Sequence, residues 1–429
     1  MLDILKTNTP PRDLSISLAA PPNWTFAPGD TIIGNIVRKT HLVTPDASLK
    51  LSLKGITATK SEENYNDSAR TYELHWDLWP VTWDEAFRGP LHIAEWSDAD
   101  EYLICPFEVT IPRRPSGTLI KRHPAEQSYL PLDDDSVAQQ GLPGSFRCAT
   151  PGGSKSCHGC IEYFLEAVLR YTRGGSLVTC RAIRRVVLRH IQTPSEPPVL
   201  YYETKQWRSG PQTVQSQRLE PGREDASLTF IQKTHKFFGS SRVPKFTYRV
   251  EVCAPRTVQL DNPLLIPFTV KAVPQLGPDK TSSSIRDSLH SIQIKIHSFK
   301  LTIDAKTGLR VSARPYANRI HYDHHTTFHT EVLDCNPPLS LSVGGNETET
   351  EPIDIGQLFE INLRTDGLHW TGRRHPIWQT IINSSSVYPD FVSYLIKHWH
   401  WICWEIVLGV AGEKQKVKGR AELKVLAAD

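Results

Sequence analysis

The sequence lacks the short motifs that identify several large classes of enzyme. It contains no Gly-x-Ser-x-Gly nucleophile elbow, no His-Glu-x-x-His zinc motif, no P-loop and no dinucleotide-binding fingerprint. These absences favour a non-catalytic protein over an enzyme, and no cofactor is predicted.

The sequence also lacks a hydrophobic run of the length that crosses a bilayer. The most apolar stretch, 399–412, includes Glu405 and is shorter than the roughly 20 residues that a membrane-spanning helix needs. The first six residues show no basic region followed by an apolar one, so no signal peptide is expected. We therefore expect a cytoplasmic protein whose eight cysteines are mostly free thiols.

A strong excess of charge of either sign is absent as well. The formal net charge is +3 in 429 residues, which does not indicate a dedicated nucleic-acid-binding protein. A local group of cations remains, and it falls in a proline-bearing segment predicted to be an exposed loop. Arg113, Arg114, Lys121 and Arg122 form this group and are the candidate partner-binding residues. Their guanidinium and ammonium groups suit phosphorylated peptides or acidic lipids, whereas the alternative is an ordinary solvated loop.

What the sequence does contain is a pattern of short β-strands broken by 32 prolines. The segment 26–30, Phe-Ala-Pro-Gly-Asp, is typical of a tight turn. The next residues, 31–37, are rich in β-branched side chains and predict a half-buried strand. A chain of this length and composition fits two domains of about 200 residues each.

A second strand is predicted over 48–59. Leu49, Leu51 and Leu53 alternate with polar residues there, so one face of the strand is apolar and the other polar. Gly55 predicts a bend or a bulge within it. Further along, 62–70 is interpreted as a loop, 72–96 as one strand with an irregular connection, and 132–140 as a helical turn.

These segments resemble the arrestin-like family. The first two strands carry the resemblance through Phe26, Pro28, Gly29, Asp30, Gly34 and Gly55. Later segments that resemble family strands, or the residues that precede such strands, are 102–112, 142–146, 161–167 and 262–272. The resemblance implies an all-β fold of two antiparallel, immunoglobulin-like β-sandwich domains of arrestin type in tandem. The domains would span 1–191 and 203–429, with a proline-rich linker at 192–202.

The segment 160–171 fits two kinds of secondary structure. Its apolar residues fit a helical stripe, and its composition of Glu, Leu and Ala favours a helix. The same residues also fit one face of a strand. Because its Ile-Glu-Tyr-x-Leu-Glu-Ala run resembles a family strand, we predict a strand.

The resemblance implies a cytosolic adaptor, recruited peripherally to the plasma membrane or endosomes. It would bind the tails of membrane-protein cargo and couple them to ubiquitin-dependent endocytosis or sorting. Many such adaptors recruit a HECT-class ubiquitin ligase through a Pro-Pro-x-Tyr peptide, but here the sequence 197–201, Pro-Pro-Val-Leu-Tyr, has one residue too many. The alternative is a scaffold subunit of a sorting coat, similar to the arrestin-shaped retromer subunit.

Two groups of residues leave metal binding open as a further alternative. Cys157 and Cys160 have the spacing of half a zinc knuckle, with Cys148 nearby, but no second ligand pair matches them. The segment 321–329 contains His321, Asp323, His324, His325 and His329, and alternation would place several of them on one strand face. A metal-dependent enzyme at His321 is the least favoured hypothesis.

Overall fold

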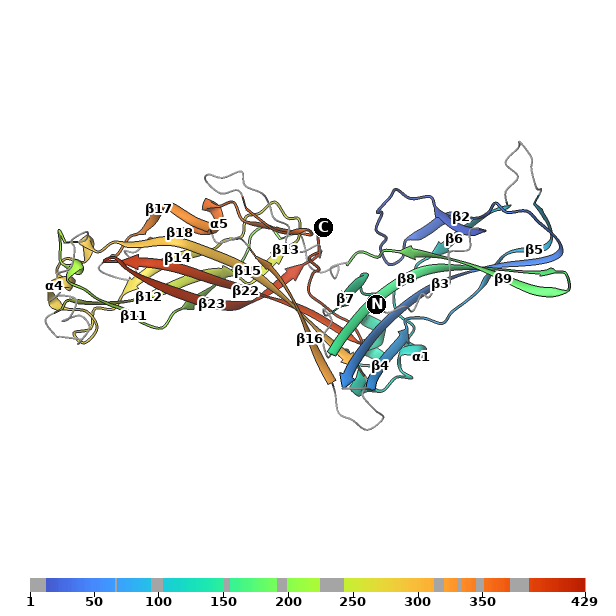
Figure 1. Cartoon of the computed structure of the whole chain (residues 1–429), viewed down its shortest axis with the longest axis horizontal. Coiled ribbons are helices and arrows are strands. Elements are labelled where there is room, and N and C mark those ends of the chain that lie inside the picture. The colour runs from blue at the N-terminus through green and yellow to red at the C-terminus, as the bar shows by residue number, and fades with distance from the viewer. Residues whose placement is uncertain are drawn as a thin grey trace. The chain divides into compact units, whose positions relative to one another are not determined.

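The computed structural model describes residues 13–65, 68–93, 103–149, 155–190, 199–223, 243–311, 320–329, 333–344, 351–370 and 386–428. These residues are predominantly in antiparallel strands, with only a few short helices (Figure 1). The prediction of an all-β fold is confirmed.

The chain divides into two compact units. Unit 1 comprises Met1–Thr193, Thr307–His324 and Phe391–His398, and unit 2 comprises Pro194–Lys306, His325–Asp390 and Trp399–Asp429. The first break lies inside the predicted linker at 192–202. Two segments from the second half of the chain belong to unit 1. The predicted domains are contiguous ranges, 1–191 and 203–429, and place both segments in the second domain.

Unit 1 contains a three-stranded and a six-stranded sheet, in blue to green in Figure 1. The smaller sheet has the order β1 (Leu14–Leu18), β2 (Thr31–Arg38), β6 (Leu103–Thr110). The larger has the order β4 (Ser68–Asp77), β3 (Leu42–Tyr65), β8 (Lys155–Arg173), β7 (Phe146–Ala149), with β5 (Asp84–Ile93) also on β3 and β9 (Ser176–Val186) on β8. Short helices are α1 (Gly117–Ile120), η1 (Ala125–Gln127) and α2 (Asp134–Gln139).

The pairing of β3 with β8 is the longest in unit 1. It runs without a register shift from Ala47 opposite Tyr171 to Glu63 opposite Lys155. Leu49, Leu51 and their partners on β8 are buried, as the alternating pattern predicts. The strand predicted over 160–171 is thereby confirmed. The segment forms a strand in spite of its helical pattern, because β8 pairs with β3 on one side and with β9 on the other.

Gly55 does not form the bend or bulge that the sequence predicts, because β3 stays in register with β8 through this position. The missing side chain instead makes room for the indole of Trp79, which a Cβ at residue 55 would overlap. The Trp79 indole N–H donates to the Leu53 carbonyl at 3.0 Å, and its ring stacks on Tyr163 with centroids 5.9 Å apart. The glycine therefore serves close packing.

Two other predictions for unit 1 are corrected and one is confirmed. The predicted loop at 62–70 is largely the end of β3 and the start of β4, which pair as a hairpin. The region 72–96 holds the end of β4 and the whole of β5, not a single strand. The predicted helical turn is α2, which Asp133 caps by accepting a hydrogen bond from the Ser136 amide at 2.9 Å.

Unit 2 buries one hydrophobic cluster drawn from its main sheets. One sheet contains β10 (Thr204–Arg208), β11 (Gln212–Gln215), β12 (Lys245–Pro255), β14 (Thr269–Pro274) and β18 (Ile353–Asp354). A seven-stranded sheet contains β13 (Thr257–Gln259), β23 (Glu413–Leu426), β22 (Ile396–Val410), β15 (Ile294–Val311), β16 (Ile320–His329), β17 (Leu333–Leu341) and β21 (Phe391–Val392). Of these strands, β21, the last residues of β15 and the first residues of β16 and β22 belong to unit 1. The remaining elements are β19 (Asn362–Arg364), β20 (Gly367–His369), η2 (Gln217–Leu219), α4 (Ser283–Arg286), η3 (Leu289–Ser291) and α5 (Ile355–Leu358).

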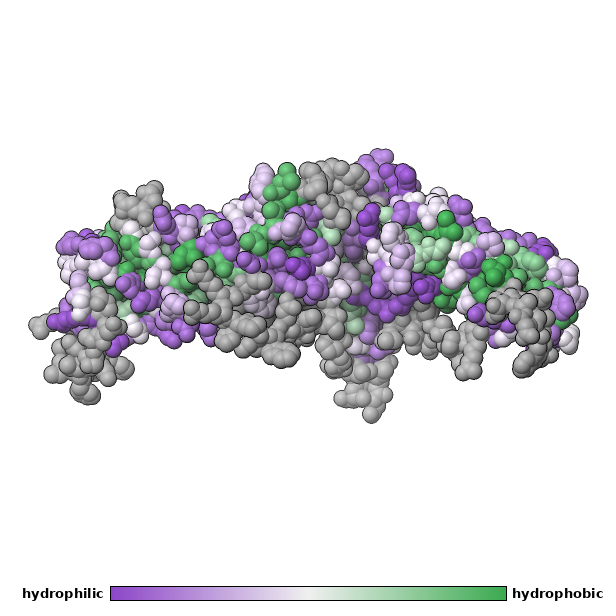
Figure 2. Space-filling view, turned by 90° about the horizontal axis from the view of Figure 1, so that it is seen from above, coloured by the Kyte–Doolittle hydropathy of each residue, from purple (hydrophilic) through white to green (hydrophobic). Residues whose placement is uncertain are grey.

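Within the described part of the chain, none of the helices has the length and apolar character needed to cross a membrane. The face shown in Figure 2 carries hydrophobic groups in separate patches among hydrophilic ones. Exposed apolar side chains include Ile33, Val43, Ile104 and Leu177.

The substitution Leu51→Asp is expected to unfold unit 1, because it places a carboxylate in a position that is 2% exposed. Burial of an unpaired charge should lower the free energy of unfolding by at least about 4 kcal/mol. Chemical denaturation followed by tryptophan fluorescence measures the change. The control Leu177→Asp alters a side chain that is 70% exposed and should shift the midpoint little. Native-like melting of Leu51→Asp would contradict the assignment of this strand face to the core.

The substitution Gly55→Ala tests the packing of Trp79. The added methyl group overlaps the indole, so we expect a loss of about 1–3 kcal/mol in the free energy of unfolding. The Trp79 emission should shift as the ring leaves its place. Gly141→Ala is the matched control, since no atom lies within 4 Å of the added Cβ there. Equal stability of the two variants would argue against the close approach.

Candidate functional site

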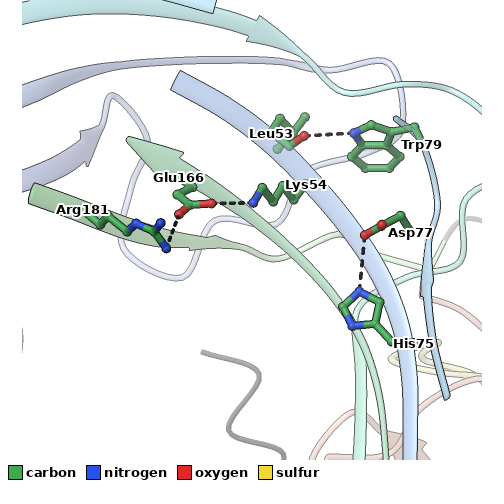
Figure 3. Close-up of polar contacts among 7 residues, drawn as sticks. All are labelled: Leu53, Lys54, His75, Asp77, Trp79, Glu166 and Arg181. Atoms are coloured by element: carbon green, nitrogen blue, oxygen red, sulfur yellow. Dashed lines mark hydrogen bonds and ion pairs between the residues drawn. The ribbon is translucent and has the colours of Figure 1, made fainter. Parts of the chain in front are cut away.

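A concentration of charged groups in unit 1 lies on one face of the six-stranded sheet. Glu166 of β8 lies between Lys54 of β3 and Arg181 of β9 (Figure 3). The Glu166 carboxylate is 2.5 Å from the Lys54 ammonium group and 3.8 Å from the Arg181 guanidinium group. The three strands are adjacent in the sheet, so the triad is set by strand pairing alone.

A second triad is centred on Glu162, four residues before Glu166 on β8. Arg147 of β7 donates from Nε to the Glu162 carboxylate at 2.9 Å, and Arg185 of β9 donates to the same oxygen at 3.2 Å. Glu162 and Glu166 are four residues apart on β8, and so are Arg181 and Arg185 on β9. An even spacing keeps both pairs on one face of a strand.

The cations of the two triads reach solvent while the carboxylates do not. The side chains of Arg147, Arg181 and Arg185 are 43%, 65% and 51% exposed, against 9% and 8% for the two glutamates. Four cations therefore cover two carboxylates, and the surface carries an excess of positive charge. We call Lys54, Arg147, Arg181 and Arg185 the arginine cluster. Guanidinium groups fixed in this way can bind carboxylates or phosphates through two parallel hydrogen bonds.

The positive surface ends toward β4. There, His75 and Asp77 lie two residues apart, with the His75 ring nitrogen 3.3 Å from the Asp77 carboxylate (Figure 3). Both side chains are exposed. An acidic partner would be favoured on the β8 and β9 side of the face and not next to Asp77.

The four residues predicted as a partner-binding loop surround α1. Lys121 forms an ion pair with Asp134, and Arg114 donates to the Ala138 carbonyl, so both help to hold α2 in place. Arg113 and Arg122 are exposed, and the described residues supply no ion-pair partner for either. Binding through this loop stays a prediction, and it depends mainly on these two arginines.

The three cysteines lie close together in sequence but do not share one face. Cys157 and Cys160 are three residues apart on β8, so their side chains point to opposite faces. Burial raises the pKa of Cys148 and of Cys160 to about 12, which keeps both thiols protonated at neutral pH. The described residues contain no group of three His, Cys, Asp or Glu side chains placed to hold a metal ion.

The histidine segment lies on β16, Ile320–His329. Its backbone is a strand, as the metal hypothesis for this segment assumed. The side chains of this segment lie outside the described residues, and the metal hypothesis at His321 stays a prediction.

The arginine cluster was not predicted as a site from the sequence. Its parts are visible there as two glutamates and two arginines, each pair spaced by four. That signal becomes informative only once both segments are known to be adjacent strands, because a spacing of four also places residues together on a helix.

No protein-family model matches the chain, and no curated protein matches its sequence.

The double variant Arg113→Glu with Arg122→Glu tests the predicted loop. If the loop meets acidic lipid, reversing both charges should weaken sedimentation with phosphatidylserine vesicles by at least about tenfold, because each basic residue near such a surface contributes ~1 kcal/mol. Arg88→Glu with Arg173→Glu is the control, since it reverses two exposed charges elsewhere in unit 1. Unchanged vesicle binding by the loop variant would leave these arginines as solvated surface residues.

Proposed function

We propose that this chain is a non-catalytic adaptor of arrestin type, built as two tandem β-sandwiches, which binds the tails of membrane-protein cargo. The observation that carries the proposal is the arginine cluster on the exposed face of the six-stranded sheet. Its fixed cations suit an extended acidic or phosphorylated segment, such as a cargo tail.

The residues that carry the resemblance in and before the first two strands contribute to packing and to the turn, as expected of residues that define a fold. Phe26 is buried and hydrogen-bonds through its backbone to Val187 and Arg189. Gly29 has a φ of 95°, and the Asp30 carboxylate accepts a hydrogen bond from the Ala27 amide at 2.8 Å. These contacts support the proposed fold type for unit 1.

Gly34 supports the same proposal from within β2. A Cβ at this position would collide with the Ser17 carbonyl and the ring of Phe107. Glycine therefore permits the close approach of β1 and β6 to either side of β2. The motif glycines of both β2 and β3 thus serve packing between neighbouring elements.

The coupling step is also part of the proposal. Bound cargo would be passed to ubiquitin-dependent endocytosis or sorting, at the plasma membrane or endosomes. Because the sequence lacks a Pro-Pro-x-Tyr peptide, a HECT-class ligase would have to dock by another contact or through a further protein. Proximity labelling in the native cell, with and without nutrient stress, would identify both cargo and ligase.

The double variant Arg181→Gln with Arg185→Gln tests cargo binding. Both side chains are more than half exposed, and their removal leaves Glu166 paired with Lys54 and Glu162 paired with Arg147. Folding should therefore be retained. We expect affinity for a fluorescein-labelled, serine-phosphorylated acidic peptide, measured by anisotropy, to fall by about tenfold or more.

Arg88→Gln with Arg173→Gln removes the same charge from other exposed positions and should change the affinity by less than about twofold. Equal losses in both variants would indicate a general charge effect and would contradict a specific site. An adaptor should also be found free of partners for part of the time, whereas a constant high-mass complex on gel filtration of lysate would favour the coat-scaffold alternative.

A further inference from the structure

A buried cation in unit 1 lies next to a half-buried thiol. Arg38 is the last residue of β2, at a position that strand alternation directs into the core together with Ile32 and Ile36. It is only 3% exposed. Its Nη1 donates a hydrogen bond to the sulfur of Cys180, on β9, at 3.6 Å. Both residues belong to unit 1, so this contact is internal to that unit.

The described residues supply no carboxylate to the Arg38 guanidinium group, and its buried Nε has no hydrogen-bond partner among them. Burial of an unpaired charge is costly, and buried charged side chains are therefore usually paired. Glu162 and Glu166 meet this requirement from the other side, since each of them is buried beside a cation. An anion within reach of Arg38 would offset the cost of burying it.

Two titratable side chains lie close enough to Arg38 to supply that anion. One is Tyr171 of β8, whose ring centroid is 5.4 Å from the guanidinium carbon, and the other is Cys180. Burial raises the pKa of Tyr171, the neighbouring Cys180 raises it further, and the charge of Arg38 only partly opposes the rise. The phenol therefore stays protonated at neutral pH. That leaves the thiolate of Cys180 as the anion that balances Arg38.

Most of the other cysteines lie in surroundings that suppress reactivity. Burial raises the pKa of five of the eight thiols, those of Cys105, Cys148, Cys160, Cys335 and Cys403, so they stay protonated at neutral pH. Cys253 of β12 is half-buried like Cys180, but no described cation donates a hydrogen bond to its sulfur. Cys253 is therefore a natural control of similar exposure within the same chain.

We propose that Cys180 is a modification site, a thiolate that hydrogen peroxide oxidises to a sulfenic acid, with Arg38 as the positioning residue that stabilises the thiolate. A half-exposed sulfur beside a fixed guanidinium group is the kind of electropositive environment in which reactive cysteines are found. The proposal does not depend on the arginine cluster, because Arg181, the residue after Cys180, lies on the opposite face of β9.

The chemical step is a two-electron oxidation of sulfur. The Cys180 thiolate attacks one oxygen of hydrogen peroxide, so an S–O bond forms while the O–O bond breaks. Sulfur is oxidised and the peroxide is reduced. The oxygen bound to sulfur keeps its hydrogen, and the other leaves as hydroxide, which takes a proton from solvent and becomes water. The products are the sulfenic acid of Cys180 and one water molecule.

Treatment of the full chain with hydrogen peroxide, with dimedone present to trap sulfenic acid, tests the proposal by mass spectrometry. Trypsin should release Cys180 in the peptide 174–181 and Cys253 in the peptide 250–256, each with a single cysteine. An ordinary thiol is only a few per cent ionised at neutral pH, so a full thiolate is roughly 30-fold more abundant, although its lower nucleophilicity removes part of that gain. We therefore expect Cys180 to be labelled at least about tenfold faster than Cys253. Rates in urea, where both thiols are exposed, correct for differences in trapping and detection.

Three variants test the part played by Arg38. Arg38→Gln should lower the labelling rate of Cys180 to within about threefold of the Cys253 rate, whereas Arg38→Lys keeps a cation and should retain most of the rate. Rescue by lysine would not be expected if the guanidinium group only filled space. Arg170→Gln is the matched control, because it removes an exposed cation from the other face of β8 and should leave the rate unchanged. Melting curves confirm that the variants are folded.

Three results would overturn the proposal. The first is equal labelling of Cys180 and Cys253 in the folded wild-type chain, which needs no variant. The second is an unchanged Cys180 rate in Arg38→Gln. The third is an equal loss in Arg170→Gln, which would mean a general effect of charge. Because no peptide ligand is present in these experiments, their failure is distinguishable from failure of the adaptor proposal.

Discussion

The uninterrupted pairing of β3 with β8 is the constraint on which unit 1 depends. Because the two strands stay in register from Ala47 to Glu63, every side chain on them has a fixed face. One face supplies Leu49, Leu51 and their partners to the core. The other face places Lys54 beside Glu166 of β8. A slip of one residue would exchange the two faces, so the core and the arginine cluster are specified by the same hydrogen bonds.

The buried glutamates link the fold to the surface charge. An unpaired carboxylate in such a place would be costly, so each glutamate has to retain at least one cation. The cations are thereby held with their outer edges toward solvent. The same arrangement occurs in unit 2, where Glu251 of β12 is 2% exposed. Its direct partners on the two neighbouring strands are Arg208 of β10 and Lys271 of β14, and both form ion pairs with it. Surface charge in both units is therefore organised by acids beneath it.

Local patterns in the sequence predict much of the secondary structure, because they act within a few residues. The alternation from Leu49 to Leu53 predicts a strand, and Asp133 is a capping residue at the start of the predicted helical turn. Contacts between distant segments could not be predicted in this way. The sequence around Gly55 predicts a bend or a bulge, because nothing nearby in sequence points to Trp79, 24 positions later. The loop predicted at 62–70 is a hairpin because pairing with a neighbour outweighed its polar composition. The arginine cluster needs four strands, and no single segment contains it.

The arrangement of the arginine cluster bears on what it can bind. In the arginine cluster the cations already share carboxylates, so a partner must compete with Glu162 and Glu166 or use the outer guanidinium edges that these leave free to bind. That arrangement favours an extended chain, which meets several cations in succession at modest cost in desolvation.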